Sequence, residues 1–157
     1  MLNLNEYNKT YHDSLIGFLY KCLPESGRTL DIDGRYKMYK DINRYFDCFL
    51  CMFDNKMIIG TVGIKKLNNK KCELKSLYIF KDYYGKSIGF ELLSKVIKIA
   101  IDLGYDEMYL DTLSNSKRAI SLYEKIGFKV TKKYNNNEFA DIFMVLDLKN
   151  PRFIFEK

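Results

Sequence analysis

Between Cys72 and Phe128 the chain reads CELKSLYIFKDYYGKSIGFELLSKVIKIAIDLGYDEMYLDTLSNSKRAISLYEKIGF, and this stretch decides the fold. Its apolar first part predicts a strand over Cys72–Phe80, which a basic turn connects to an amphipathic helix over about Ser87–Leu103. A second strand over Glu107–Thr112 and a second helix over about Ser116–Ile126 come next. Because the first helix is the crossover between the two strands, we expect these strands to be parallel.

The turn itself, Tyr84-Gly85-Lys86-Ser87-Ile88-Gly89, has small residues where the chain leaves the strand and enters the helix. Backbone N–H groups in such a turn can approach a ligand without intervening Cβ atoms. A helix N-terminus of this kind favours anions, above all phosphates. The alternative is that Gly85 and Gly89 only shape the turn.

This order of elements, together with the segment Ala119-Ile120-Ser121-Leu122-Tyr123-Glu124-Lys125-Ile126-Gly127-Phe128, resembles the GNAT superfamily of acyl-CoA-dependent N-acetyltransferases. The resemblance covers most of the chain and is strongest from Cys72 to Leu148. It implies an α/β fold with a mixed, mostly antiparallel sheet of about seven strands, helices on both faces, and splayed fourth and fifth strands. It also implies that acetyl-CoA is the co-substrate and that the acetyl group passes to a small-molecule or protein amine.

In this family the turn reads Arg or Gln, any two residues, Gly, any residue, then Gly or Ala, and its amides hold the pyrophosphate of coenzyme A. Here Gly89 matches the last position, whereas Ser87 replaces the usual first Gly and Tyr84 replaces Arg or Gln. Ser87 can still offer its N–H group, and its hydroxyl suits a helix N-cap. The resemblance implies that the following residues bind the coenzyme: Tyr84, Gly85, Lys86, Ser87, Ile88, Gly89 and Phe90.

The first strand of this region carries two further implied roles. A backbone N–H group near Leu77, Tyr78 and Ile79 is implied as the donor to the oxyanion, because the family splays this strand from the next. Glu73 lies where some branches of the family carry a general base. The alternative for Glu73 is an exposed strand carboxylate that pairs with Lys75 or with a neighbouring strand.

The second helix carries the remaining implied roles. Tyr123 matches the general acid of the family, which protonates the departing thiolate, and its alternative role is packing in the core. Ser116, three residues before Ala119, stands where the family usually has an Asn that contacts coenzyme A. Asn115 is the other candidate for this contact, and Ser116 is also an ordinary helix N-cap. Ala119 is implied as a further coenzyme contact.

The length and composition indicate a globular protein, and we expect one N-acetyltransferase domain over residues 1–157. Hydrophobic residues make up 47% of the chain, which excludes a disordered protein. No apolar run approaches the roughly 18 residues that a membrane span needs. The first residues lack the basic region and apolar core of a signal peptide, so we expect a cytoplasmic protein without a membrane partner.

The net charge of +6 is compatible with nucleic acid, with an acidic substrate or with the phosphates of coenzyme A. The lysines are scattered along the chain, and no helix-turn-helix, zinc-finger or aromatic RNA-binding motif accompanies them, so we expect no nucleic-acid partner. A non-catalytic acyl-CoA-binding or sensor module on the same fold is the alternative to an enzyme. Because this fold often forms homodimers, a homodimer is a candidate assembly.

Four cysteines and one histidine are the potential metal ligands of the soft type. Cys48 and Cys51 have the spacing of a metal-binding pair, but they lie in a predicted strand, where residues three apart point to opposite faces. We therefore expect buried, reduced thiols and no metal. His12 has no identifiable partner in the sequence and is expected to be a surface or packing residue.

The rest of the chain predicts a conventional arrangement of short elements. Asn8 or Thr10 is the expected cap of the first helix. The predicted elements are a short strand at Leu2–Leu4, helices at Tyr11–Cys22 and Arg35–Asn43, strands at Phe46–Phe53 and Met57–Lys66, and a last hairpin of Phe128–Tyr134 with Phe139–Leu148. The candidates for recognising the acceptor, or simply for surface charges, are Arg28, Asp31, Asp33 and Arg35. The tail Arg152–Lys157 carries no identifiable role.

Overall fold

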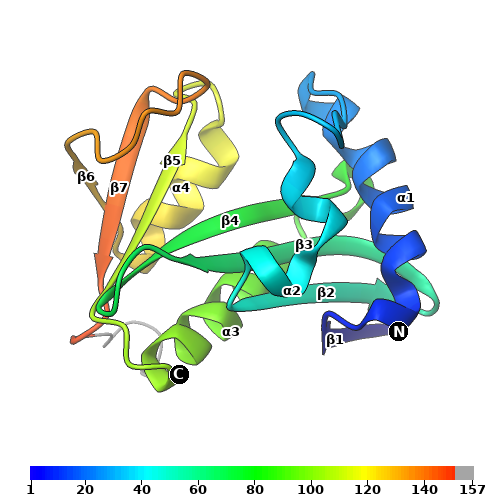
Figure 1. Cartoon of the computed structure of the whole chain (residues 1–157), viewed down its shortest axis with the longest axis horizontal. Coiled ribbons are helices and arrows are strands. Elements are labelled where there is room, and N and C mark those ends of the chain that lie inside the picture. Colours follow the sequence, from blue (N-terminus) through cyan, green and yellow to red (C-terminus); the bar gives the residue numbers. More distant parts are fainter. Residues whose placement is uncertain (151–157) are drawn as a thin grey trace. The chain divides into compact units, whose positions relative to one another are not determined.

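A computed structural model describes residues 1–150, so the tail from Arg152 lies outside the described residues. Its strands form a seven-stranded sheet in the order β1-β2-β3-β4-β5-β7-β6 (Figure 1). The strands are β1 (Leu2–Glu6), β2 (Cys48–Asp54), β3 (Met57–Lys66), β4 (Lys71–Ile79), β5 (Glu107–Thr112), β6 (Lys129–Thr131) and β7 (Ile142–Asp147). The α-helices are α1 (His12–Cys22), α2 (Ile42–Tyr45), α3 (Ile88–Asp102) and α4 (Lys117–Ile126). The 3-10 turns are η1 (Lys9–Tyr11), η2 (Leu23–Ser26), η3 (Lys37–Lys40) and η4 (Lys81–Tyr83).

The sheet is mixed, as expected. β1 and β2 pair antiparallel, and so do β2 and β3. β5 and β4 pair parallel, which confirms the crossover role of α3. The parallel ladder joins Lys71–Glu73 to Glu107–Tyr109, and β4 continues beyond it to Ile79. β7 lies between β5 and β6 and is antiparallel to both.

The chain divides into two compact units. Unit 1 consists of Met1–Lys65 and Lys75–Val96, and unit 2 consists of Lys66–Leu74 and the described residues from Ile97 onward. That the whole chain is one domain stays a prediction. Within residues 1–150, no helix has the length and apolar character that a bilayer crossing requires.

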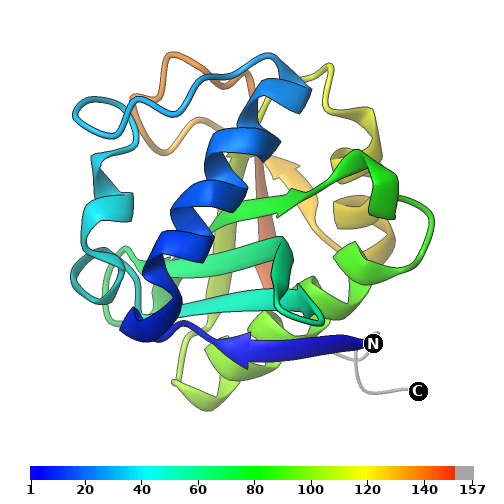
Figure 2. The ribbon, with the colours of Figure 1, turned by 90° about the vertical axis from the view of Figure 1, so that its right-hand side faces the viewer.

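Unit 1 buries its apolar side chains on both faces of its strands. On one face, α1 crosses β2 and β3 (Figure 2), and the buried Leu15 and Phe18 of α1 belong to the same apolar cluster as Phe49 and Cys51 of β2. On the other face, α3 approaches β3 so closely that a Cβ built on Gly60 would lie 3.3 Å from Leu92. Glycine at this position therefore permits the helix to pack against the strand.

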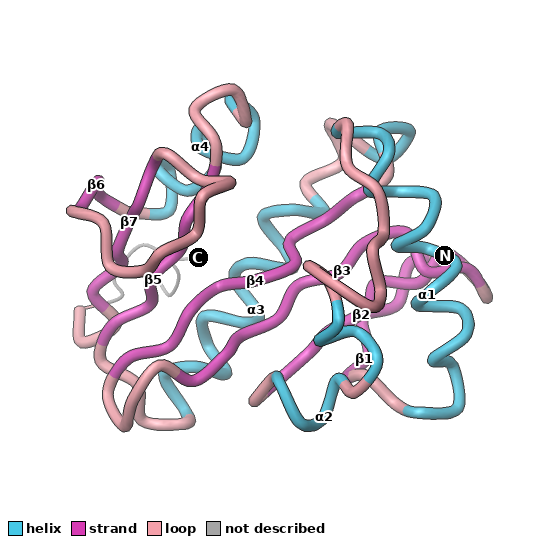
Figure 3. Tube along the Cα trace, turned by 45° about the horizontal axis from the view of Figure 1, so that its top comes forward, coloured by secondary structure: helices cyan, strands magenta, loops and turns pink. Residues whose placement is uncertain are grey.

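Unit 2 is built on the strands β5, β7 and β6, which lie side by side (Figure 3). Met108 and Leu110 of β5 pair with Leu146 and Met144 of β7, and all four side chains are buried. Residues two apart on a strand point to the same face, which explains this alternation. α4 ends at Gly127, whose positive φ of 124° permits the chain to turn back into β6.

The structure corrects three local expectations. The predicted helix over Arg35–Asn43 is replaced by η3 and the short α2, separated at Asp41. The last hairpin is shorter than predicted, because β6 ends at Thr131 and β7 starts at Ile142. Asn8 does act as a cap, but its side chain accepts from the N–H of Thr10 in η1, one turn before α1 begins. In the first case, the apolar residues Tyr36, Tyr39 and Ile42 that suggested a regular helix are buried without one continuous helix.

Candidate active site

The turn between β4 and α3 contains two left-handed residues, Gly85 with a φ of 81° and Ser87 with a φ of 62°. Residues with a Cβ atom rarely adopt this backbone conformation, whereas glycine adopts it freely. The backbone therefore explains why a glycine would be usual at position 87. The carbonyl of Ser87 accepts a hydrogen bond from the N–H of Glu91, as the carbonyl of an N-cap residue does. The backbone of Ser87 is left-handed and not extended, and the capping role of its hydroxyl stays a prediction.

Two side chains anchor this turn within unit 1. The hydroxyl of Tyr83 donates to Asp54 at 2.5 Å, and the N–H of Lys81 donates to Glu25 at 2.9 Å. The hydrogen bond from Tyr83 lowers the pKa of Asp54 below its usual value. The turn is thus connected to the β2–β3 hairpin and to η2.

The exposed part of the turn has the properties of an anion site. Gly85, Lys86 and Ser87 are exposed, and the first N–H groups of α3 have no carbonyl partner within the helix. α3 continues for 15 residues, so its dipole adds to the attraction for negative charge. The predicted binding residues from Tyr84 to Phe90 are therefore brought together in one turn.

β4 has an irregular backbone just before the predicted oxyanion donors. Ser76 has a φ of 60°, and its carbonyl accepts a hydrogen bond of 2.7 Å from the buried hydroxyl of Thr61. The hydroxyls of Ser76 and Tyr39 lie 2.5 Å apart. These contacts hold β4 in its irregular form, and the half-buried Leu77, Tyr78 and Ile79 follow directly.

Glu73 is buried in unit 2, with 4% of its surface exposed. The alternative that it is an exposed strand carboxylate is therefore wrong. Its Oε2 accepts a hydrogen bond of 2.5 Å from the hydroxyl of Tyr134 and one of 3.2 Å from Nδ2 of Asn135. Such donors stabilise the ionised form of a buried carboxylate.

The sequence analysis did not identify Tyr134, Asn135 or Asp111, which surround Glu73. Nδ2 of Asn135 also donates to Oδ2 of Asp111 at 2.6 Å. Asn135 lies in a run of three asparagines that suggested only a turn, because asparagine is a common turn residue. Asp111 could have been found, because it lies two residues after Tyr109, which pairs with Glu73 in the parallel ladder.

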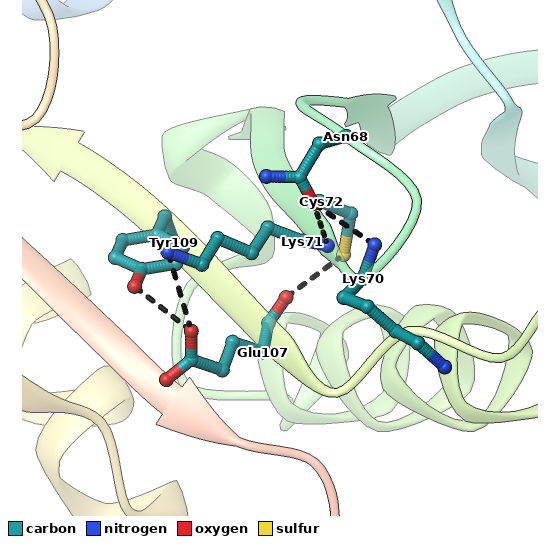
Figure 4. A network of polar contacts seen from close by, with 6 residues as sticks. All are labelled: Asn68, Lys70, Lys71, Cys72, Glu107 and Tyr109. Atoms are coloured by element: carbon teal, nitrogen blue, oxygen red, sulfur yellow. Dashed lines mark hydrogen bonds and ion pairs between the residues drawn. The ribbon is translucent and has the colours of Figure 1, made fainter.

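A second polar network lies at the start of β4 and β5 (Figure 4). Nζ of Lys71 lies 5.4 Å from the centre of the Tyr109 ring and 3.8 Å from Oε1 of Glu107. The hydroxyl of Tyr109 donates to the same oxygen of Glu107 at 2.9 Å. Tyr109 therefore bonds to Glu107 through its hydroxyl, while its ring packs against Tyr134 with the centroids 5.0 Å apart.

Tyr123 lies on α4 and is 7% exposed. Its ring packs against Phe128, with the ring centres 5.6 Å apart, and its carbonyl accepts from the N–H groups of Gly127 and Phe128. The residues of the Leu-Tyr-Glu-Lys-any-Gly-Phe segment thus form one packed helix end. This packing is compatible with both roles that the sequence suggests for Tyr123.

The other predicted coenzyme contacts lie at the start of α4. Ser116 occupies the N-cap position, but its side chain makes no capping hydrogen bond. Asn115 is exposed and Ala119 is half-buried. The structure therefore leaves both polar side chains at the helix start, and the choice between Asn115 and Ser116 stays a prediction.

The cysteines and His12 occupy the structural positions expected for them. All four cysteines are buried and none forms a disulfide, and His12 Nδ1 lies 2.8 Å from the hydroxyl of Tyr7. Among residues 1–150, no three His, Cys, Asp or Glu side chains are arranged to hold a metal ion. Of the charged candidates for acceptor recognition, Asp33 forms an ion pair with Lys40, and Asp31 accepts from the N–H of Arg35.

The mixed sheet, the parallel β4–β5 pair and the strand-turn-helix unit between them define the GNAT fold. A model of the acetyltransferase (GNAT) family matches residues 11–128. The chain therefore belongs to this family, which confirms the resemblance seen in the sequence.

Several curated proteins are similar to the chain over part of their length. Human N-acetyltransferase 8B is 30% identical over 138 residues, which cover 82% of this chain and 59% of the human protein. An uncharacterized N-acetyltransferase of Schizosaccharomyces pombe is 36% identical over 78 residues, 49% of this chain and 48% of the yeast protein. The chain thus spans about half the length of these two relatives.

Solved structures show the same fold over nearly the whole chain. A GNAT-family acetyltransferase from Staphylococcus aureus has a TM-score of 0.83 and 26% identity, and the match covers 94% of this chain and 99% of that one. The PaiA N-acetyltransferase of Thermoplasma acidophilum, solved in complex with coenzyme A, has a TM-score of 0.76, 23% identity and coverage of 94% and 99%. YncA from Salmonella typhimurium, solved with acetyl-CoA, has a TM-score of 0.72, 22% identity and coverage of 94% of each chain.

Proposed function

We propose that the protein transfers an acetyl group from acetyl-CoA directly to a primary amine. Membership of the GNAT family supports acetyl transfer, and two proteins of similar fold were solved with coenzyme A or acetyl-CoA. The observation that carries the proposal is the left-handed backbone of Ser87, at the position where the family motif has glycine. A left-handed residue at the start of a helix is a backbone arrangement that can turn successive N–H groups toward an anion, which supports the proposal.

In the proposed complex the amides of the turn bind the pyrophosphate of coenzyme A. The exposed Gly85, Lys86 and Ser87 are the first contacts, and the helix start at Ile88 and Gly89 supplies further N–H groups. The ammonium of Lys86 adds a positive charge to the same surface. The family resemblance gives Asn115, Ser116 and Ala119 as further proposed coenzyme contacts.

The proposed reaction needs a neutral amine, a stabilised oxyanion and a proton for the departing thiolate. An alkyl ammonium has a pKa of about 10.4, so a base must take its proton at neutral pH, and Glu73 is the proposed base. The amine then attacks the thioester carbon, and a backbone N–H group at Leu77–Ile79 stabilises the oxyanion. When the C–S bond breaks, the hydroxyl of Tyr123 donates a hydrogen bond to the departing sulfur. The attached nitrogen loses its second proton, the thiolate takes up one proton, and a neutral amide and coenzyme A remain.

Proton transfer from a phenol to a thiolate is uphill by about 2 kcal/mol when both have ordinary pKa values. Tyr123 can therefore act by donating a hydrogen bond to the sulfur, without giving up its own proton. This role requires the hydroxyl of Tyr123.

Calorimetric titration with acetyl-CoA and coenzyme A tests the binding part of this proposal. We expect both ligands to bind, with affinity that falls as salt is added, because the phosphates contribute charge. A screen of amines for the release of coenzyme A then identifies an acceptor. A protein that binds no acyl-CoA would contradict the proposal.

Two substitutions test the chemical part and separate an enzyme from a non-catalytic acyl-CoA-binding module. Tyr123→Phe and Glu73→Gln should each lower kcat by about 100-fold while the coenzyme affinity stays the same. Tyr20→Phe is the matched control, because Tyr20 is a 69% exposed residue of α1. If the protein binds acetyl-CoA but releases no coenzyme A with any amine, the non-catalytic alternative holds.

A further inference from the structure

Two consecutive residues of the connection between β6 and β7 bind the same oxygen of Glu73. Tyr134 donates through its hydroxyl at 2.5 Å and Asn135 donates through Nδ2 at 3.2 Å, both to Oε2. They lie 61 and 62 positions after Glu73 in the chain, so only the folded structure brings them together. A carboxylate with two donors on one oxygen has a restricted orientation.

We propose that Tyr134 and Asn135 are positioning residues that hold the carboxylate of Glu73 in one orientation, and that Asp111 acts on Glu73 through Asn135. The inference rests on the proposed function, in which Glu73 is the general base. It assigns the residues after β6 a role in catalysis that their sequence does not suggest. Neither Tyr134 nor Asn135 has to touch the acceptor for this role.

The surrounding contacts hold Tyr134 as a permanent donor. Its ring packs against Tyr109, with the centres 5.0 Å apart, and against Phe143, with the centres 5.7 Å apart. Burial, and next the negative charge of Glu73, raise the pKa of Tyr134 far above that of an ordinary tyrosine. The hydroxyl therefore keeps its proton at every pH at which the enzyme would work.

The orientation of the Asn135 amide follows from its neighbours. Its Oδ1 accepts from the backbone N–H of Asn137 at 3.1 Å, so Nδ2 is the group that faces the two carboxylates. Nδ2 lies 3.2 Å from Glu73 and 2.6 Å from Asp111. Because one amide connects two carboxylates, a change at Asp111 should reach Glu73.

Glu73 lies among several hydrogen-bonding and charged groups. Tyr134 and Asn135 donate to its carboxylate, and Asn135 also donates to the carboxylate of Asp111. The other charged or titratable groups on this part of β4 and β5 are Lys71, Cys72, Lys75, Glu107 and Tyr109. In the proton transfer itself, one N–H bond of the ammonium breaks and one O–H bond forms on Glu73, so no further reactant is needed.

The pH dependence of kcat/KM provides the test, because loss of fold alone would not shift it in a defined direction. In Tyr134→Phe the carboxylate loses a hydrogen-bond donor to its charged form, so the acidic limb of the profile should move to higher pH. In Asp111→Asn a negative charge is removed, so the limb should move to lower pH. In both variants kcat should change more than the KM for acetyl-CoA.

Tyr109→Phe is the matched control, because its hydroxyl bonds to Glu107 and not to Glu73. We expect this variant to keep the acidic limb of the unchanged protein. Asn135→Ala provides a second route if Tyr134→Phe does not fold, and it should move the limb in the same direction as Tyr134→Phe. Unchanged limbs in Tyr134→Phe and Asn135→Ala would overturn the inference.

A measurement that needs no turnover separates this inference from the proposed function. Carboxyl ¹³C NMR of Glu73, assigned with Glu73→Gln, should show a higher pKa in Tyr134→Phe and a lower pKa in Asp111→Asn. If these shifts appear but no amine is acetylated, the positioning contacts hold and the proposed function fails. If acetylation occurs but neither variant moves the pKa of Glu73, the positioning role is refuted while the proposed function stands.

Discussion

Ser87 adopts a left-handed backbone conformation that glycine adopts more easily than serine does. Its φ of 62° costs an L-amino acid roughly 1–2 kcal/mol relative to the right-handed region. Glycine would remove this strain but would gain about 0.5–1 kcal/mol of conformational freedom in the unfolded chain. Position 87 thus has the left-handed backbone that glycine would allow, and the backbone N–H group of serine is available as that of glycine would be.

We expect Ser87→Gly to be neutral or stabilising by up to about 1 kcal/mol, because strain relief exceeds the added chain entropy. Ser87→Val should destabilise the fold by about 1–2 kcal/mol, since a β-branched residue adopts positive φ with difficulty. Urea unfolding measures both effects, and calorimetry should show acetyl-CoA affinity retained in the glycine variant and reduced in the valine variant. Ser121→Val, on the exposed side of α4, is the control. Equal stability of the glycine and valine variants would contradict this account.

Thr61 supports the irregular backbone of β4 at the scale of a single hydrogen bond. Its buried hydroxyl donates to the carbonyl of Ser76, and valine has nearly the same shape without the donor. We expect Thr61→Val to cost about 1–3 kcal/mol, because the carbonyl loses a partner in a buried position. Urea unfolding checks this cost, with the exposed Thr29→Val as the reference. An unchanged midpoint would show that Ser76 does not depend on this bond.

At the scale of elements, two glycines differ in the space around them. A Cβ on Gly63 of β3 would lie 2.9 Å from ring carbons of both Phe46 and Phe49. A Cβ on Gly17 of α1 would meet nothing within 4 Å. Gly63 is therefore required by packing, whereas Gly17 only weakens its helix.

Alanine at these two positions should have effects of opposite sign. Gly63→Ala should destabilise the protein by about 1–3 kcal/mol, because two aromatic rings must move. Gly17→Ala should stabilise it by up to about 1 kcal/mol, because alanine is the better helix former. Thermal and urea unfolding of the two variants provide the comparison. A stabilising Gly63→Ala would mean that the rings of β2 and its preceding segment repack easily.

The elements were predicted best where the local pattern agrees with the fold. β5 has the predicted bounds, and α3 differs from its prediction by one residue at each end. The prediction of a regular helix over Arg35–Asn43 was wrong. The apolar residues of this segment, among them Tyr36 and Tyr39, are buried in 3-10 and irregular structure. Short 3-10 turns and irregular segments can bury such residues as well as a regular helix can, and the sequence pattern does not show which of these structures forms.

At the scale of the whole molecule, the cysteines report on opening of the fold. Burial raises the pKa of Cys22 and Cys51 to about 12 and that of Cys48 to about 11. A thiol with a pKa of about 11 is ionised in only about one molecule in a thousand at pH 8. Both the scarcity of thiolate and the burial protect these side chains from alkylation.

We therefore expect slow alkylation of all four cysteines in native buffer and fast alkylation in urea. The rate should rise as the pH approaches 11, because more thiolate forms, and it should rise steeply across the unfolding transition. Mass spectrometry of the labelled peptides resolves Cys72, which lies in unit 2, from the three cysteines of unit 1. Rapid native labelling of Cys48 or Cys51 would contradict their burial.

The sequence by itself determined the order of most elements, the family and the position of the strand-to-helix turn between β4 and α3. These properties are local, because periodicity and small residues act through neighbouring positions in the chain. Only the tertiary structure decided that Glu73 is buried and that Tyr134 and Asn135 contact it. The reason is that their contact depends on the strand order, in which β7 lies between β5 and β6, and no local rule relates residues so far apart.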